Sequence, residues 1–136
     1  MDGAAVLAAF DEQIRRRPEA GLGAAVEHVA QVVRVVASGD GWSGVTWSEL
    51  SDADVDAVIA AQVHRFTGRR WEWKYYSYDR PLTLPGRLRA ARLVADEVEA
   101  LMVAQISDLD LAVPPPEGVQ LVPVVDADGV EVLGSA

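Results

Sequence analysis

The chain has 136 residues, half of them hydrophobic, so it suits one domain with a real core and is too short for two full domains. Because it has no cysteine, no apolar run of membrane-spanning length and no basic N-terminal signal segment, we expect a soluble, cytoplasmic protein with no disulfides and no membrane partner. The net charge of −9 arises from residues 93–136, which contain nine acids and no base, and a segment of this sign argues against nucleic acid as a partner.

The first predicted element is a helix over residues 2–17. Asp2 can cap its N-terminus, apolar residues follow at three-to-four spacing, and Pro18 ends it. The three arginines at 15–17 suit the negative end of the helix dipole. Residues 21–24 have the glycine spacing of a phosphate-binding loop, but a helix rather than a strand precedes them, so we interpret these glycines as a turn.

Two strands are predicted next, over residues 31–37 and 45–50, joined by a glycine-rich turn. Ser51 then caps a helix with a clear apolar stripe, which ends at Gly68. A third strand is expected over residues 71–76.

Pro85 fits the first turn of another helix, which we expect to end near Ala95. Residues 98–106 are nearly all apolar, which is typical of a strand buried on both faces. The predicted fold class is therefore α+β, with a mixed, mostly antiparallel sheet flanked by helices in the order α-β-β-α-β-α-β.

The character of the sequence changes after the main domain, which we assign to residues 1–112. A proline-rich linker is expected over residues 113–118. Residues 119–136 are expected to form one extra strand, 119–125, and a turn at 126–129. They are too short to complete a fold, so we interpret them as the start of a missing second domain.

The segment RWEWKYYSYDRP at residues 70–81 holds five of the nine aromatic residues. One interpretation is a central strand whose tryptophans pack under a helix while Glu72 pairs with Lys74, followed by a turn in which Asp79 accepts from backbone N–H groups. The other interpretation is a ligand-binding face. Its candidate residues are Trp71, Trp73, Tyr75 and Arg80.

Other chemical signals are weak. His28 and His64 have no second ligand at helical spacing, so we predict no metal site. Carboxylate pairs such as Asp52 and Asp56 lie where helix caps and solvated acids are usual, rather than in an acid–base arrangement.

Three strings together resemble a known family. They are EWKYYSYDRP at residues 72–81, LPGRLRAA at 84–91 and VEALMVA at 98–104. Over about residues 26–125 the chain resembles the N-terminal half of actinobacterial two-domain GNAT acetyltransferases. The string PEGVQLVPV at 116–124 is similar to the opening strand of the second GNAT domain in those proteins.

The resemblance implies a degenerate GNAT domain. GNAT enzymes bind acetyl-CoA at a Q/R-x-x-G-x-G/A loop between a strand and the following helix, and the matching junction here is residues 47–53. It has no glycine, and Asp52 and Asp54 place negative charge where a pyrophosphate would lie. We therefore expect no cofactor on this chain, and acetyl-CoA only where a catalytic second domain is present.

The resulting prediction is the non-catalytic N-terminal lobe of a GNAT-type N-acetyltransferase, with a scaffold, dimerisation or acceptor-substrate role. Its expected partner is a second copy or a C-terminal GNAT domain, and both a fragment of a longer enzyme and a shortened relative fit the sequence. One alternative is a minimal GNAT acetyltransferase active as a dimer, and another is a standalone small-ligand-binding or protein-interaction module. The catalytic candidates for the minimal enzyme are the phenols Tyr75, Tyr76 and Tyr78.

Overall fold

The computed structural model describes residues 2–110 and 112–125, in two compact units, Met1–Glu99 and Ala100–Ala136. The first unit is an α+β domain with one four-stranded sheet, and the predicted fold class is confirmed. Among the described residues, no helix is both long and apolar enough to cross a membrane.

The N-terminal helix forms as predicted. Helix α1 covers Gly3–Phe10, and Asp2 caps it by accepting a hydrogen bond from the Ala4 backbone N–H at 3.0 Å. It continues without a break as a short π-helix, η1, over Asp11–Arg15. A π-helical turn rotates the following side chains relative to an α-helix, and such turns are frequent at functional sites.

The sheet is built from three consecutive antiparallel strands and one short parallel strand, in the order β1-β2-β3-β4. The strands are β1 (Ala24–Val29), β2 (Val32–Ala37), β3 (Gly44–Ser48) and β4 (Glu72–Trp73). The two middle strands match the predicted pair, whereas β1 was not predicted, because its sequence AAVEHV alternates only weakly. It forms because the tight turn at Ala30, with φ of 49°, folds it back on β2.

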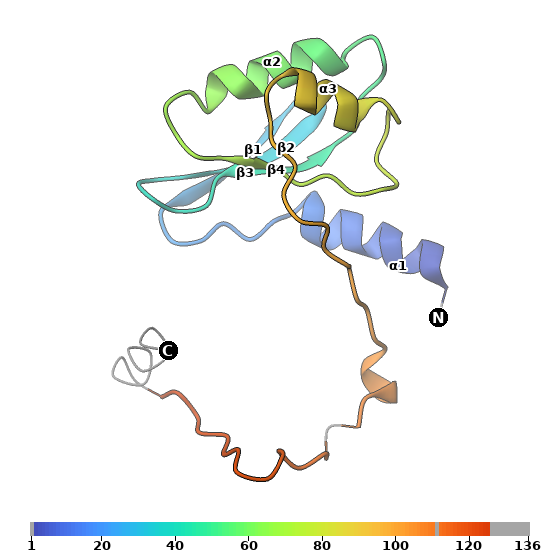
Figure 1. Ribbon diagram of the computed structural model, residues 1–136, viewed down its shortest axis with the longest axis vertical. Helices are drawn as coiled ribbons and strands as arrows, with labels where there is room; N and C mark the ends of the chain where they lie inside the picture. Colours follow the sequence, from blue (N-terminus) through green and yellow to red (C-terminus); the bar gives the residue numbers. More distant parts are fainter. Residues whose placement is uncertain (1, 111, 126–136) are drawn as a thin grey trace. The chain divides into compact units, whose positions relative to one another are not determined.

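Two helices cover one face of this sheet (Figure 1). They are α2 (Val55–Arg65) and α3 (Leu84–Ala90), and both lie inside the ranges predicted for them to within one residue. In Figure 1, α1 lies on the opposite side of the sheet from α2 and α3. The sheet is therefore the middle layer of the first unit.

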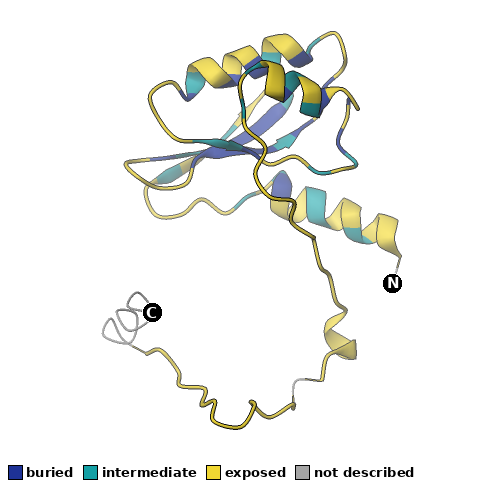
Figure 2. Ribbon diagram, in the orientation of Figure 1, coloured by how far each residue is buried: buried dark blue, intermediate teal, exposed yellow. Residues whose placement is uncertain are grey.

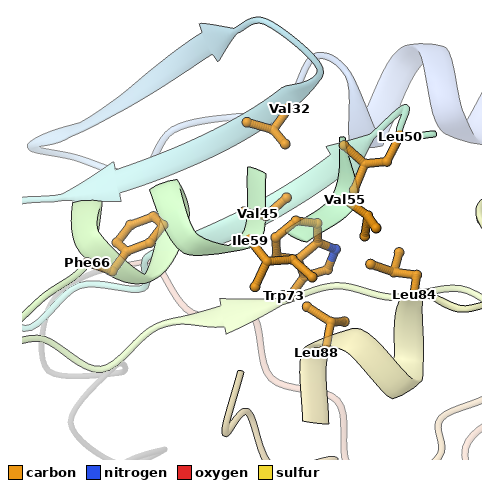
Figure 3. Packing of buried hydrophobic residues seen from close by; sticks show 9 residues of the cluster. All are labelled: Val32, Val45, Leu50, Val55, Ile59, Phe66, Trp73, Leu84 and Leu88. Atoms are coloured by element: carbon orange, nitrogen blue, oxygen red, sulfur yellow. The ribbon is translucent and has the colours of Figure 1, made fainter. Parts of the chain in front are cut away.

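The core lies between the sheet and the helices α2 and α3, and buried strand residues face buried helix residues there (Figures 2 and 3). Phe66 and Leu84 are among its largest fully buried side chains, and each contributes roughly 1.5–3 kcal/mol through burial. The cluster consists of Val32, Val45, Leu50, Val55, Ile59, Phe66, Trp73, Leu84 and Leu88.

The position of the aromatic strand corrects one prediction. Residues 71–76 were expected to form a central strand, but β4 spans only Glu72–Trp73 and lies at the edge of the sheet, next to β3. It pairs in parallel with Gly44 and Val45, and the chain then turns away. The tertiary reason is that the hairpin β1–β2 already occupies the other side of β3, which leaves only an edge position.

The two C-terminal strands are also corrections. Neither residues 98–106 nor 119–125 form a strand in the described part of the chain, so the expected order ends at α3. In the second unit the only regular element of the described residues is a short 3-10 helix, η2 (Ile106–Asp108). A strand is stable only when its backbone groups pair in a ladder, and the described sheet provides none for these segments. The predicted turn at 126–129 lies outside the described residues.

Candidate functional site

The tryptophans of the aromatic segment belong to the core. Trp73 is 9% exposed and packs in the cluster between the sheet and the helices, while Trp71 stacks on Phe66 with ring centroids 4.9 Å apart. On the other side of the strand, Lys74 pairs with Glu72 at 2.9 Å. The interpretation of a tryptophan face packed under a helix, with this ion pair opposite, is therefore confirmed.

The structure separates the four residues predicted to bind a ligand. Trp71 and Trp73 take part in the hydrophobic packing, whereas Tyr75 is 39% exposed. Arg80 is exposed and donates to the carbonyl oxygens of Tyr78 and Asp79 at 3.3 and 3.4 Å, within its own turn. Ligand binding by this set stays a prediction.

A buried arginine is the centre of the polar contacts in the first unit. Arg15, at the end of η1, is 3% exposed and forms a bidentate ion pair with Asp79, with both N–O distances at 2.8 Å. It also donates to the Asp11 carboxylate at 2.9 Å and to the Thr46 carbonyl at 3.1 Å. A planar guanidinium is well matched to a bidentate carboxylate partner, and burial strengthens such a pair.

A bulge in the sheet brings Thr46 to this arginine. Val33 pairs with Trp47 and Arg34 with Val45, so Thr46 is the extra residue on β3. Its hydroxyl donates to the Arg15 carbonyl at 2.7 Å. The bulge therefore fastens η1 to the sheet through two reciprocal contacts between the same two residues.

Two of the three candidate tyrosines surround the same guanidinium. The Arg15 guanidinium carbon lies 4.3 Å from the Tyr76 ring centroid, a cation–π distance, and 5.6 Å from that of Tyr78. The Tyr78 hydroxyl donates to Asp11 at 2.8 Å, and Asp79 accepts from the Tyr76 backbone N–H at 3.0 Å. The predicted acceptor role of Asp79 in the turn is therefore confirmed, while its larger role as the partner of Arg15 was missed.

These contacts control the ionisation of the cluster. Burial works to lower the pKa of Arg15, but the hydrogen bonds and charges of Asp79, and then of Asp11, outweigh burial and raise the pKa. Burial and the hydrogen bond to Asp11 raise the pKa of Tyr78 to about 12. A phenol that holds its proton so firmly is a poor general acid at neutral pH. The arrangement is better suited to holding η1 against the sheet and the turn after β4 than to transferring a proton.

A second polar cluster fastens α2 to the hairpin. Glu27 on β1 accepts from Arg34 Nε at 2.6 Å and from Arg65 at 2.8 Å, and Arg34 also donates to Gln62 at 2.8 Å. Glu27 and Arg34 are direct cross-strand partners, which places them on the same face of the sheet. The hydrogen bond from Arg65, reinforced by Arg34, holds the pKa of Glu27 below its ordinary value despite burial.

The junction before α2 is the segment that the resemblance matches to the acetyl-CoA loop of GNAT enzymes. It contains acidic side chains that already accept hydrogen bonds from neighbouring side chains. Asp54 accepts from Ser51 Oγ at 2.7 Å and from Gln31 Nε2 at 3.1 Å, and Asp52 accepts from Thr83 Oγ1 at 2.8 Å. Asp56 follows in the first turn and pairs with Arg87. The start of the helix is thus surrounded by carboxylates.

No group of three or more potential metal ligands occurs among the residues that the structure describes. Within the same residues, two buried side-chain polar atoms lack a hydrogen-bond partner, Ser48 Oγ and Trp73 Nε1. Comparison of the chain with protein-family models, with curated proteins and with solved structures finds no match.

Sequence reasoning missed Arg15 as the centre of the polar cluster. Its local signal was the spacing of four residues from Asp11, which is typical of a helical ion pair. The pairing with Asp79, 64 positions away, has no signal in a single sequence.

Proposed function

We propose that this chain is a non-catalytic lobe of a GNAT-type N-acetyltransferase, which acts in the cytoplasm as a scaffold, a dimer contact or a support for the acceptor substrate. The observation that carries the proposal is the acidic, glycine-free junction between β3 and α2. This is the place where the resemblance would put the cofactor's pyrophosphate.

The electrostatics of the junction argue against a bound pyrophosphate. A helix N-terminus attracts an anion when its backbone N–H groups are free and no negative side chain is near. Here Asp52, Asp54 and Asp56 lie within five positions, and their carboxylates already accept hydrogen bonds from neighbouring side chains. A diphosphate would meet three like charges and compete with these contacts.

Neither of the two candidate tyrosines at the buried polar centre of the first unit is a free proton donor. Acetyl transfer by this chain alone would require one of the candidate tyrosines to act as the acid. The Tyr78 hydroxyl already donates a hydrogen bond to Asp11, and the Tyr76 ring lies against the Arg15 guanidinium. This supports a lobe that depends on another domain for catalysis over a minimal acetyltransferase.

Exposed apolar residues support an association role. In the second unit, Met102 is 89% exposed and Leu121 79%, and most of its other large apolar side chains are exposed as well. Large apolar side chains that stay exposed to solvent are candidates for contact with a partner. A C-terminal GNAT domain or a second copy of the chain is the partner that the proposal predicts.

Isothermal titration calorimetry of the purified chain with acetyl-CoA tests the cofactor part of the proposal. We expect no saturable heat at millimolar acetyl-CoA, and a stoichiometric site with a Kd tighter than about 1 mM would overturn it. The variant Asp52→Asn/Asp54→Asn is a matched control, because it removes two negative charges at the junction and keeps the side-chain shapes. Sedimentation velocity of the same sample tests the dimer contact, and a strict monomer at all concentrations would remove it.

A further inference from the structure

A groove of about 540 Å³ lies on the side of η1, away from the core. Its volume is within the range of small-molecule sites, which is about 300–1,000 Å³. Its lining comes from η1, the segment after it, the loop before β3, β3 itself and the start of the segment after β4. The lining residues are Gln13, Ile14, Arg15, Arg17, Pro18, Glu19, Trp42, Thr46, Lys74 and Tyr76.

The walls of the groove present large apolar side chains to solvent. Ile14 is 58% exposed and Trp42 is 41% exposed, although both are residue types that usually gain stability from burial. The six-membered ring of Trp42 packs against Gly44, since a Cβ atom there would be only 2.7 Å from it. A half-exposed indole is a platform on which a flat group can stack.

The cations of the groove are not equivalent. Arg15 forms its base, and its charge is balanced by Asp79 and Asp11. Lys74 is the single lysine of the chain, its side chain is 45% exposed, and its partner Glu72 is itself 38% exposed. An exposed pair of this kind contributes little to stability, so Lys74 can bind another anion at small cost.

Lys74 reaches over the indole of Trp42. Its ammonium nitrogen is 5.8 Å from the centroid of the Trp42 ring. A flat group stacked on this ring therefore places a substituent at its edge within reach of the ammonium. Arg17 adds a second exposed cation to the lining, where it pairs with Glu12 outside the groove, and Glu19 is the only acid of the lining.

We propose that this groove binds a small planar carboxylate, whose ring stacks on Trp42 against Ile14 and whose carboxylate pairs with Lys74. The inference does not depend on the proposed function, because it uses neither the α2 junction nor the second unit. It also differs from the predicted ligand face, whose tryptophans lie in the core.

The test uses 2-naphthoate as the probe, followed by the indole N–H signals of the four tryptophans in two-dimensional NMR spectra. We expect the Trp42 signal to shift in a saturable way with a Kd of about 1 mM or tighter, while the buried Trp73 signal stays in place. The neutral amide 2-naphthamide and the cation 2-naphthylmethylammonium should bind at least about tenfold more weakly. Equal binding of the three probes, or a Trp42 signal that does not move, would overturn the proposal.

Two variants of equal charge change locate the carboxylate. Lys74→Gln should weaken 2-naphthoate at least about tenfold, whereas Arg16→Gln should leave it unchanged, because Arg16 lies over Trp47 at 4.0 Å and outside the groove. Similar losses in both variants would refute a specific role for Lys74. Dispersed indole signals in each spectrum check that the variant is folded.

The single lysine offers an independent measurement. Reductive methylation with ¹³C-formaldehyde labels only Lys74 and the N-terminal amine, and it keeps the positive charge. The Lys74 methyl signal should shift with 2-naphthoate at the same Kd as the Trp42 signal. A methyl signal that is insensitive to the probe would place the carboxylate elsewhere and overturn the assignment.

Discussion

The buried pair of Arg15 and Asp79 provides the sharpest test of how the N-terminal helix is fastened to the sheet. In the variant Asp79→Ala, the guanidinium stays buried and loses its bidentate partner. Breaking a buried pair from one side typically costs about 3–5 kcal/mol of unfolding free energy, because a charge is left uncompensated. The backbone N–H of Tyr76 also loses its acceptor, which costs about 1 kcal/mol more.

Asp11 reduces the expected loss. Its carboxylate is 28% exposed and still accepts from Arg15 at 2.9 Å, so part of the charge remains balanced. We therefore expect a loss of about 4 kcal/mol, at the lower end of the combined range of about 4–6 kcal/mol. Because domains of this size unfold with about 5–15 kcal/mol, this loss is a large share of the total stability.

The assay is urea denaturation followed by tryptophan fluorescence, with the free energy of unfolding extrapolated to water. Arg80→Ala is the matched neighbour, because Arg80 is exposed and donates to carbonyl oxygens of its own turn, and we expect it to change stability by less than about 0.5 kcal/mol. The double variant Arg15→Met/Asp79→Leu should recover most of the loss, since an apolar pair leaves no buried charge. The buried pair does not act as described if Asp79→Ala costs less than about 1 kcal/mol. The same holds if the loss in the double variant equals the sum of the losses in Arg15→Met alone and Asp79→Leu alone.

Three further predictions concern other groups of the first unit. The pKa of Glu27 is lowered in the folded state, so the ionised Glu27 stabilises the fold above the ordinary carboxyl pKa of about 4.3, and this stabilisation is lost as pH falls through the lower folded pKa. In urea denaturation at a series of acidic pH values, the difference in unfolding free energy between the wild type and Glu27→Gln should therefore shrink below the folded pKa. A difference that stays constant with pH would contradict this. Tyr78 has a raised pKa of about 12, so its protonated hydroxyl stabilises the fold below the ordinary tyrosine pKa of about 10, and this stabilisation is lost as pH rises towards 12. The difference in phenolate absorbance between the wild type and Tyr78→Phe should appear near pH 12. Its appearance near about pH 10 would be inconsistent with the contact to Asp11. The variant Gly44→Ala should lose about 1–3 kcal/mol of unfolding free energy, because the new Cβ would lie 2.5 Å from the Glu72 carbonyl oxygen and 2.7 Å from the Trp42 ring. Gly86→Ala is the control, because no atom lies within 4 Å of the Cβ that it adds. Equal urea midpoints for the two variants would refute the crowding at Gly44.

The local patterns of the sequence determined the helices and the middle strands. Asp2 as a helix cap, the apolar stripe of α2 and the proline at the start of α3 each depend on residues within one or two turns. The same holds for the β-branched run that became β2. The absence of glycine and the acids before α2 were also visible at once, because charge and glycine content need no fold to be read.

Tertiary structure alone decided the aromatic segment. Alternation placed Trp71 and Trp73 on the face that packs against Phe66 and the helices, but it did not specify that β4 would be a two-residue edge strand. That depends on the hairpin β1–β2, whose first strand has too weak a pattern to be predicted.

The Arg15 cluster and the groove have the same origin. Three residues far apart in sequence, Arg15, Thr46 and Asp79, meet because the π-helical turn, the β-bulge and the turn after β4 converge. Spacing along a chain encodes contacts within an element, since the geometry of a helix or strand repeats. Contacts between elements depend on how those elements pack, so the sequence by itself determined the parts of this protein and the tertiary structure decided which of them meet.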